Sequence, residues 1–127
     1  WAYASLGLAE ERLMAGLAVR IRSPGFLSTF KPQETSMTAW AFASLGFRDE
    51  KLMAALADQT VSDLQTPNPK ADVQARGLVS IAWALAKLDT PHPELMQQIA
   101  TRTLKTGLLQ DLNPQGTANL AWAYAAL

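Results

Sequence analysis

The chain has 127 residues, about half of them apolar, with no cysteine and with eleven basic residues balanced by eleven acidic ones. This apolar content is enough to build a core, the lack of cysteine excludes disulfides and thiolate metal sites, and no apolar run approaches the roughly 20 residues of a membrane span. The zero net charge weighs against a strongly phosphate-driven binder, whose affinity would come from Lys and Arg.

The first predicted element is the end of a helix, residues 1–7, which stops at Gly7. Its Trp-Ala-x-Ala motif recurs, with tryptophans at positions 1, 40, 83 and 122 that are 39, 43 and 39 residues apart. A fixed period of this size indicates an array of structural repeats. The chain begins and ends inside a unit, so we expect it to be a fragment of a longer protein.

The next predicted element is a helix that Glu10 and Glu11 open, because acidic side chains are favourable near a helix N-terminus. Ser23-Pro24-Gly25 ends it, since proline removes a donor and glycine tolerates the turn. The apolar residues at helical spacing predict its buried stripe, which comprises Leu13, Met14, Leu17, Ala18 and Ile21.

A third helix starts at Pro32, where the missing N–H costs nothing, and runs to about Leu45 with Gly46 as its stop. The second helix of this unit starts at Asp49 and Glu50. Apolar residues of the second helices recur in register as well: Leu13, Leu52 and Leu95 each follow a tryptophan by twelve residues. Each unit therefore repeats two helices.

Residues 65–70 contain two prolines and no periodicity, which predicts a loop that accounts for the longer 43-residue spacing. Residues 73–88 form the next helix, and Asp89 replaces the terminal glycine because Asp tolerates the left-handed conformation. Gly107 ends its partner helix, and a last helix follows Asn113-Pro114-Gln115. The stripe predicted for the partner helix is Leu95, Met96, Ile99, Ala100 and Leu104.

These elements predict an all-α fold, an α-solenoid of stacked antiparallel helix-turn-helix repeats of about 38–43 residues, because one short hairpin cannot bury its own apolar face. The predicted units are residues 1–30 (partial), 31–72, 73–112 and 113–127 (partial), in one array. We interpret the four tryptophans as a packing ladder between hairpins, since Trp is rarely exposed, in preference to a role in stacking on bases. Indoles that point into solvent would contradict this interpretation, and with it the stacked architecture and the RNA-binding prediction that depend on it.

The residues predict no catalysis. The only histidine, His92, lies between turn residues, where we expect it to be solvated. No glycine-rich phosphate loop is present, and one His without Cys cannot fill a tetrahedral zinc site. The sequence therefore predicts a protein that is not an enzyme and has no metal, no cofactor and no small-molecule substrate.

A solenoid offers an extended concave surface lined by one helix of every hairpin. With Trp40 taken as an inward anchor, polar positions of the first helices form a stripe whose side chains differ from unit to unit. Such a surface suits reading an RNA one unit at a time, although solvent-exposed positions that are free to vary would give the same pattern. The candidate RNA-binding residues are Gln33, Glu34, Met37, Arg76, Gly77, Ser80, Lys87, Gln115, Gly116 and Asn119.

The motif Pro-Gln-x5-Ala-Trp-Ala-Phe-Ala-Ser-Leu-Gly of residues 32–46 resembles the octotricopeptide repeat family, and residues 114–127 and, in part, 82–88 carry the same motif. The resemblance implies an α-solenoid that binds single-stranded RNA in chloroplasts or mitochondria. Such proteins act in transcript stability, processing, splicing or translation, and some are parts of organellar ribosomes. The third unit departs from the pattern, with Ala75 and Arg76 in place of Pro and Gln, and Met37 stands where the family often has Asn.

We therefore expect a non-catalytic segment that binds single-stranded RNA or ribosomal RNA and does not insert into a membrane. Its neutral charge favours an alternative, a structural scaffold that holds proteins of a large organellar assembly such as a ribosome; a catalytic domain elsewhere in a longer parent is a third possibility. The candidate phosphate contacts are Arg20, Arg22, Lys31, Lys70, Arg76 and Lys87.

Overall fold

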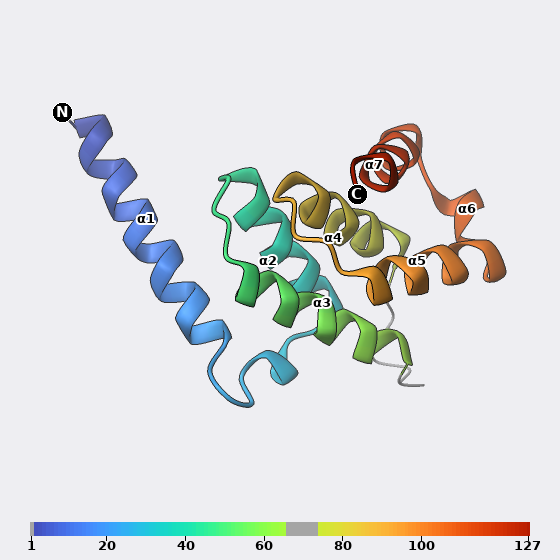
Figure 1. The fold of residues 1–127 in the computed structure, drawn as a ribbon, viewed down its shortest axis with the longest axis horizontal. Coiled ribbons are helices and arrows are strands. Elements are labelled where there is room, and N and C mark those ends of the chain that lie inside the picture. Colours follow the sequence, from blue (N-terminus) through green and yellow to red (C-terminus); the bar gives the residue numbers. More distant parts are fainter. Residues whose placement is uncertain (1, 66–73) are drawn as a thin grey trace.

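The computed structural model describes residues 2–65 and 74–127, and over these ranges the chain is helical with no strand (Figure 1). The all-α prediction is confirmed. In chain order the elements are α1 (Ala2–Ile21), the 3-10 helix η1 (Leu27–Thr29), α2 (Pro32–Ser44), α3 (Glu50–Gln65), α4 (Ala75–Lys87), α5 (Pro93–Lys105), α6 (Leu108–Asp111) and α7 (Pro114–Ala126).

Most helix boundaries follow local signals that are visible in the sequence. Pro32 and Pro114 are the first residues of α2 and α7, where proline's fixed φ suits the helix. Gly46 and Asp89 follow the ends of α2 and α4 with positive φ values of 69° and 51°. The Asp89 prediction is thus confirmed, and both helices end as the sequence predicts.

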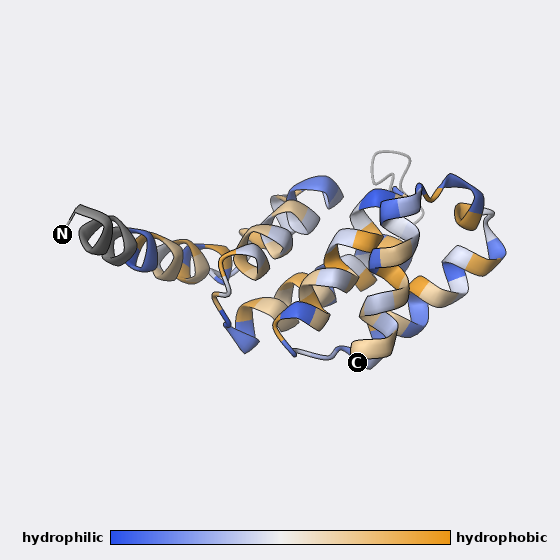
Figure 2. Cartoon of the chain, turned by 90° about the horizontal axis from the view of Figure 1, so that it is seen from above, coloured by the Kyte–Doolittle hydropathy of each residue, from blue (hydrophilic) through white to orange (hydrophobic). Residues whose placement is uncertain are grey.

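The expected break at Gly7 is wrong, because α1 continues through this residue. Figures 1 and 2 show α1 projecting away from the other helices. Among residues 10–21, whose side chains the structure describes, Ala18 and Ile21 near the C-terminal end are buried, whereas Leu13 and Leu17, predicted to be buried, are exposed. A glycine inside a helix costs only about 1 kcal/mol relative to alanine, so without a neighbouring helix to turn back onto, the chain stays helical.

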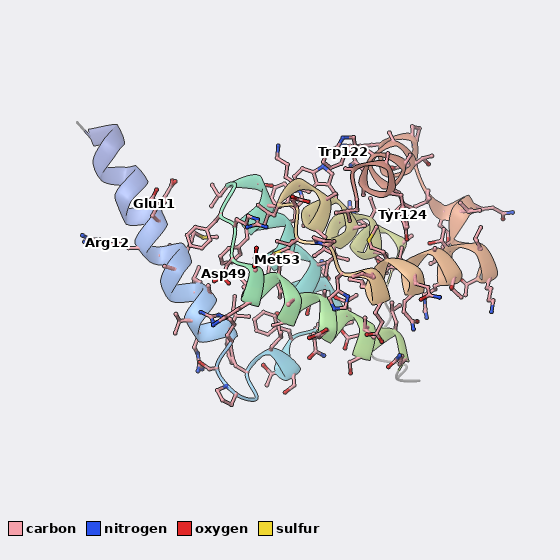
Figure 3. All side chains as sticks on the ribbon, viewed as in Figure 1. Glu11, Arg12, Asp49, Met53, Trp122 and Tyr124 are labelled. Carbon is pink, nitrogen blue, oxygen red and sulfur yellow. The ribbon has the colours of Figure 1, made fainter. Side chains whose placement is uncertain are left out.

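The other helices form two layers. In one layer α4 lies between α2 and α7 and contacts both; in the other, α3 packs against α5 and also against α2. Figure 3 shows Met53 of α3 among these helices, whereas Glu11 and Arg12 project from α1. The largest fully buried side chains fill the space between the layers and include Phe42, Leu52, Met53, Leu56, Leu78, Ile81, Leu85, Leu95 and Ile99.

The predicted tryptophan packing ladder is wrong. Trp40 is 53% exposed and Trp122 is 46% exposed. Trp83 is half-buried and packs against the core, and Trp1 lies outside the described residues. Trp40 and Trp122 therefore do not lie wedged between successive helix pairs, so the prediction that the stacking depends on these indoles is not met.

Alanines and the residues two positions after Trp40 and after Trp83 are buried instead. Ala39 and Phe42 are buried on α2, and their counterparts Ala82 and Leu85 are buried on α4. Each residue of an α-helix is rotated by about 100° from the one before it. Trp40 follows Ala39 directly and is therefore turned away from the buried face.

Polar contacts join helix ends that are far apart in sequence. The Arg48 Nε donates to the Leu88 carbonyl at 2.8 Å, and its Nη2 donates to the Asp89 carbonyl at 3.1 Å. A cation is favourable at this site because the last carbonyls of α4 carry partial negative charge. These two hydrogen bonds of Arg48 thus connect the turn after α2 to the end of α4.

His92 is not the solvated loop residue that the sequence predicts. Its Nδ1 accepts a hydrogen bond from the Leu95 N–H at 3.1 Å, and its Nε2 lies 2.7 Å from Asp58 Oδ1. The ring caps α5 and ties it to α3. Because Nδ1 accepts, the neutral ring carries its proton on Nε2, where it donates to Asp58.

Two further differences from the predicted elements lie at the C-terminal end of α5. Leu104, predicted to be buried, is 73% exposed near the end of this helix, and the short helix α6 comes after Gly107 without a sequence signal that predicted it. Gln65, the first residue of the loop predicted for residues 65–70, is the last residue of α3, and the rest of that loop lies outside the described residues.

No helix in the described ranges has both the length and the apolar character to cross a bilayer.

Candidate nucleic-acid interface

Two adjoining grooves follow the layer formed by α2, α4 and α7. The first, of about 450 Å³, lies between α2 and α4, and the second, of about 700 Å³, lies between α4 and α7. Trp40, Gln74, Arg76 and Ser80 line both. The two grooves therefore share a border and form one recessed surface across three helices.

Eight of the ten predicted RNA-binding residues line one groove or both. The first groove brings together Gln33, Met37, Arg76, Gly77 and Ser80. The second brings together Arg76, Ser80, Gln115, Gly116 and Asn119.

Glu34 and Lys87 line neither groove. The Glu34 Oε1 accepts the Lys31 backbone N–H at 2.8 Å, so this carboxylate caps the start of α2. Lys87 is exposed in the last turn of α4, where a cation is favourable. Capping at the start of α2 therefore accounts for Glu34, and the helix dipole at the end of α4 accounts for Lys87.

The two glycines of the predicted set shape the grooves. A Cβ on Gly77 would lie 3.3 Å from the Ser36 Oγ, so Gly77 permits the close approach of α4 to α2. A Cβ on Gly116 would lie 3.0 Å from the Asn113 Oδ1, which caps α7 by accepting the Gly116 N–H at 2.6 Å. A side chain at Gly77 or at Gly116 would therefore lie too close to these oxygen atoms.

The polar side chains that line the grooves fall into two groups. The hydroxyls of Ser36 and Thr60 donate to the backbone carbonyls of Gln33 and Leu56, at 3.0 and 2.9 Å. A second group makes no hydrogen bond or ion pair within the described ranges, so its donors and acceptors are open to a ligand. This group comprises the side chains of Gln33, Gln74, Arg76, Ser80, Asp111, Gln115 and Asn119.

Arg76 dominates the charge of the grooves. It is the one charged side chain among the residues that line the first groove, and the second adds only Asp111. None of the other predicted phosphate contacts lines a groove: Arg20 lies over the Phe26 ring, 3.9 Å from its centroid, and Lys70 lies outside the described residues. The surface therefore offers a single focus of positive charge.

The tryptophans are the main groove residues that the sequence interpretation missed. Trp40 lines both grooves and Trp83 lines the second, whereas Trp122, at the same position of α7, lines neither. The spacing contained the signal, because Gln33, Met37 and Trp40 are separated by four and then three residues, which is one face of a helix. Gln74, at the start of α4, was also missed and has no comparable signal.

Acid–base chemistry has no evident place in the grooves. Burial raises the pKa of the Asp63 carboxyl, and a hydrogen bond from Gln59 opposes this shift. Burial also raises the pKa of the Tyr124 phenol, which donates to the Met96 carbonyl. Neither residue lines a groove, and no cluster of three metal-binding side chains occurs within the described residues. The grooves present amides, hydroxyls, a guanidinium, the Asp111 carboxylate and indoles.

Comparisons with known proteins identify no relative: no family model, no curated protein and no solved structure matches the chain. The resemblance to octotricopeptide repeats therefore depends on the sequence motifs of residues 32–46 and 114–127 alone.

Proposed function

We propose that the chain is a non-catalytic, RNA-binding segment of a helical-repeat protein, in which α2, α4 and α7 each present recognition side chains to single-stranded RNA. One observation carries this proposal. Side chains at equivalent positions of successive helices line the grooves, all of them polar and unpaired except the apolar Met37, and their chemistry changes from Gln33 to Arg76 to Gln115 and from Met37 to Ser80 to Asn119. A constant backbone with changing side chains is how helical RNA-binding repeats read successive bases.

The proposed architecture is an α-solenoid with hairpin units at residues 31–72 and 73–112 and partial units on either side. The lateral contacts of α2, α4 and α7, together with the packing of α3 on α5, support it. Repeats of this kind contact mainly their neighbours and generate an extended binding surface. The RNA would cross the three helices, with bases in the grooves and a phosphate near Arg76.

The resemblance to octotricopeptide repeats supports a place in chloroplasts or mitochondria, in transcript stability, processing or translation. Its motif residues also fit the packing: Ala39, Phe42 and Ala43 are buried and Gly46 has the positive φ that ends α2. We propose membership of this family on these sequence motifs.

Fluorescence anisotropy with a labelled, mixed-sequence single-stranded RNA tests the function. Single-stranded binding weakens with salt according to the number of phosphates neutralised, with a slope of about −0.7 per contact on logarithmic axes. Because Arg76 is the main groove cation, we expect one or two such contacts, so the affinity falls only roughly 3- to 7-fold between 50 and 200 mM salt. Absence of binding at both salt concentrations would contradict the proposal.

A double variant provides the matched test of the stripe. Gln33→Ala with Gln115→Ala removes two unpaired amides from exposed positions, and surface changes of this kind usually leave stability within about 0.5 kcal/mol. We expect weaker RNA binding with an unchanged unfolding midpoint in urea. Glu34→Gln is the control, because Glu34 lies outside both grooves.

A second candidate function is a scaffold that holds another protein in a large organellar assembly. The apolar side chains that α1 leaves exposed, Leu13, Leu17 and Val19, favour it, as does the zero net charge. Nuclease treatment separates the two functions. A partner that stays bound after nuclease treatment supports the scaffold, whereas a partner lost on treatment supports RNA binding.

A further inference from the structure

We propose that Trp40 is a stacking platform for an unpaired base, and that the groove between α2 and α4 is a base-binding subsite. This inference rests on the proposed function and adds to it a residue, a contact type and a class of ligand. The ligand is a single-stranded nucleic acid, because bases paired in a duplex do not offer a free face to an indole.

The first argument is that nothing inside the protein explains the position of Trp40. Its indole is 53% exposed, although Trp is large and highly buried on average. Phe42 fills the core from the same helix. Trp40 takes part in none of the ring–ring or cation–ring contacts found in the described ranges. About half of the Trp40 surface is therefore open at the border of the two grooves, with no aromatic or cationic side chain stacked on it in the described ranges.

The second argument is the chemistry around the indole. Met37, one turn earlier on α2, is also exposed and continues the apolar wall. Arg76 lines the same groove from α4 and is its only charge, so a ligand that is both aromatic and anionic fits best. The amide of Gln33 and the hydroxyl of Ser80 are unpaired and can meet the edge of a base.

These features distinguish a nucleic acid from a protein partner. A protein helix could cover the indole and the thioether with apolar side chains, but it would also need polar side chains placed to meet the unpaired amides and a carboxylate for Arg76. A nucleotide supplies a flat aromatic face, polar edges and a phosphate on one unit. Stacking on aromatic side chains combined with backbone contacts is the usual way that single strands are held.

The next unit repeats the arrangement. Trp83 stands at the position of α4 that matches Trp40, and it lines the second groove together with Gln115 and Asn119. Trp122 stands at the same position of α7 and is 46% exposed, but it lines neither groove. Figure 3 shows it on α7. Trp122 is thus a matched control, an exposed indole without the groove.

The experiment measures binding of a mixed-sequence single-stranded oligoribonucleotide to the full chain and to three variants: Trp40→Ala, Trp40→Phe and Trp122→Ala. Loss of base stacking weakens binding by roughly 5- to 150-fold, so we expect a Kd increase in this range for Trp40→Ala. Trp40→Phe keeps an aromatic face and should stay within a few-fold of wild type, and Trp122→Ala should leave the Kd unchanged. Far-UV circular dichroism confirms that each variant is folded.

Tryptophan emission gives a second readout that does not depend on affinity. Saturation with unlabelled oligoribonucleotide should quench the indole emission of the wild type and of Trp122→Ala, and quench Trp40→Phe less. If the wild type binds and Trp40→Ala binds equally well, or if the Trp40 and Trp122 variants lose affinity equally, the stacking platform is wrong and RNA binding stands. If the wild type does not bind, the proposed function fails and this inference fails with it.

Discussion

The two faces of α2 place two aromatic residues in opposite environments although they are only two positions apart. Phe42 is 2% exposed and meets the Phe47 ring edge-on, with 5.5 Å between centroids, whereas Trp40 is mostly open to solvent. Phe42 shares its face with the buried Thr35 and Ala39, at spacings of seven and three residues. The comparison teaches that helical register, and not hydrophobicity alone, decides which aromatic side chain enters the core.

The largest expected effect tests the buried face. Phe42→Ala should lower the free energy of unfolding by about 3–5 kcal/mol, because it removes transfer energy and leaves a cavity between the layers. Urea denaturation followed by circular dichroism measures the loss. Phe42→Leu is the matched control, since Leu85 fills the equivalent place on α4, and it should cost less than about 1.5 kcal/mol. If Phe42→Ala left the free energy of unfolding unchanged, the assignment of this face of α2 to the core would be wrong.

An intermediate effect is expected at Trp83, which combines both environments. It packs against the core and also lines the second groove. Trp83→Ala should therefore cost about 2 kcal/mol, within the usual range for partly buried sites. The same urea titration measures it. If Trp83→Ala lowered the free energy of unfolding as much as Phe42→Ala does, Trp83 would be mainly a core residue. If it left the free energy of unfolding unchanged, Trp83 would be a groove residue only.

Local signals made the helices and much of the site predictable. The Pro32 start, the Gly46 stop and the Asp89 conformation depend on backbone preferences of single residues, which act wherever the residue occurs. The groove residues were predictable because a repeat places equivalent positions side by side. Gln33 and Gln115 lie in neighbouring grooves for this reason.

The predictions that failed depend on neighbours in space. The continuation of α1 through Gly7 depends on which helices are available to pack against it, and the contact of the His92 ring with Asp58 joins residues that are 34 positions apart. Trp40 is a different case. Its spacing from Gln33 and Met37 placed it on the polar stripe, but the general tendency of Trp to be buried was given more weight. For Trp40, the helical spacing predicted the position of the side chain better than the general tendency of Trp to be buried.

The smallest expected effect is at the exposed face. Trp40→Ala should lower the free energy of unfolding by only about 1 kcal/mol, the usual size for a single substitution, because about half of the indole is already in contact with solvent, and the same change is expected to weaken RNA binding. Trp122→Ala should be equally mild, because its indole is exposed to a similar extent. A cost of about 3 kcal/mol or more at Trp40 would mean that the indole supports the packing of α2 on α4. The two faces of α2 would then no longer differ, and the open aromatic surface on which the base-binding subsite depends would be lost.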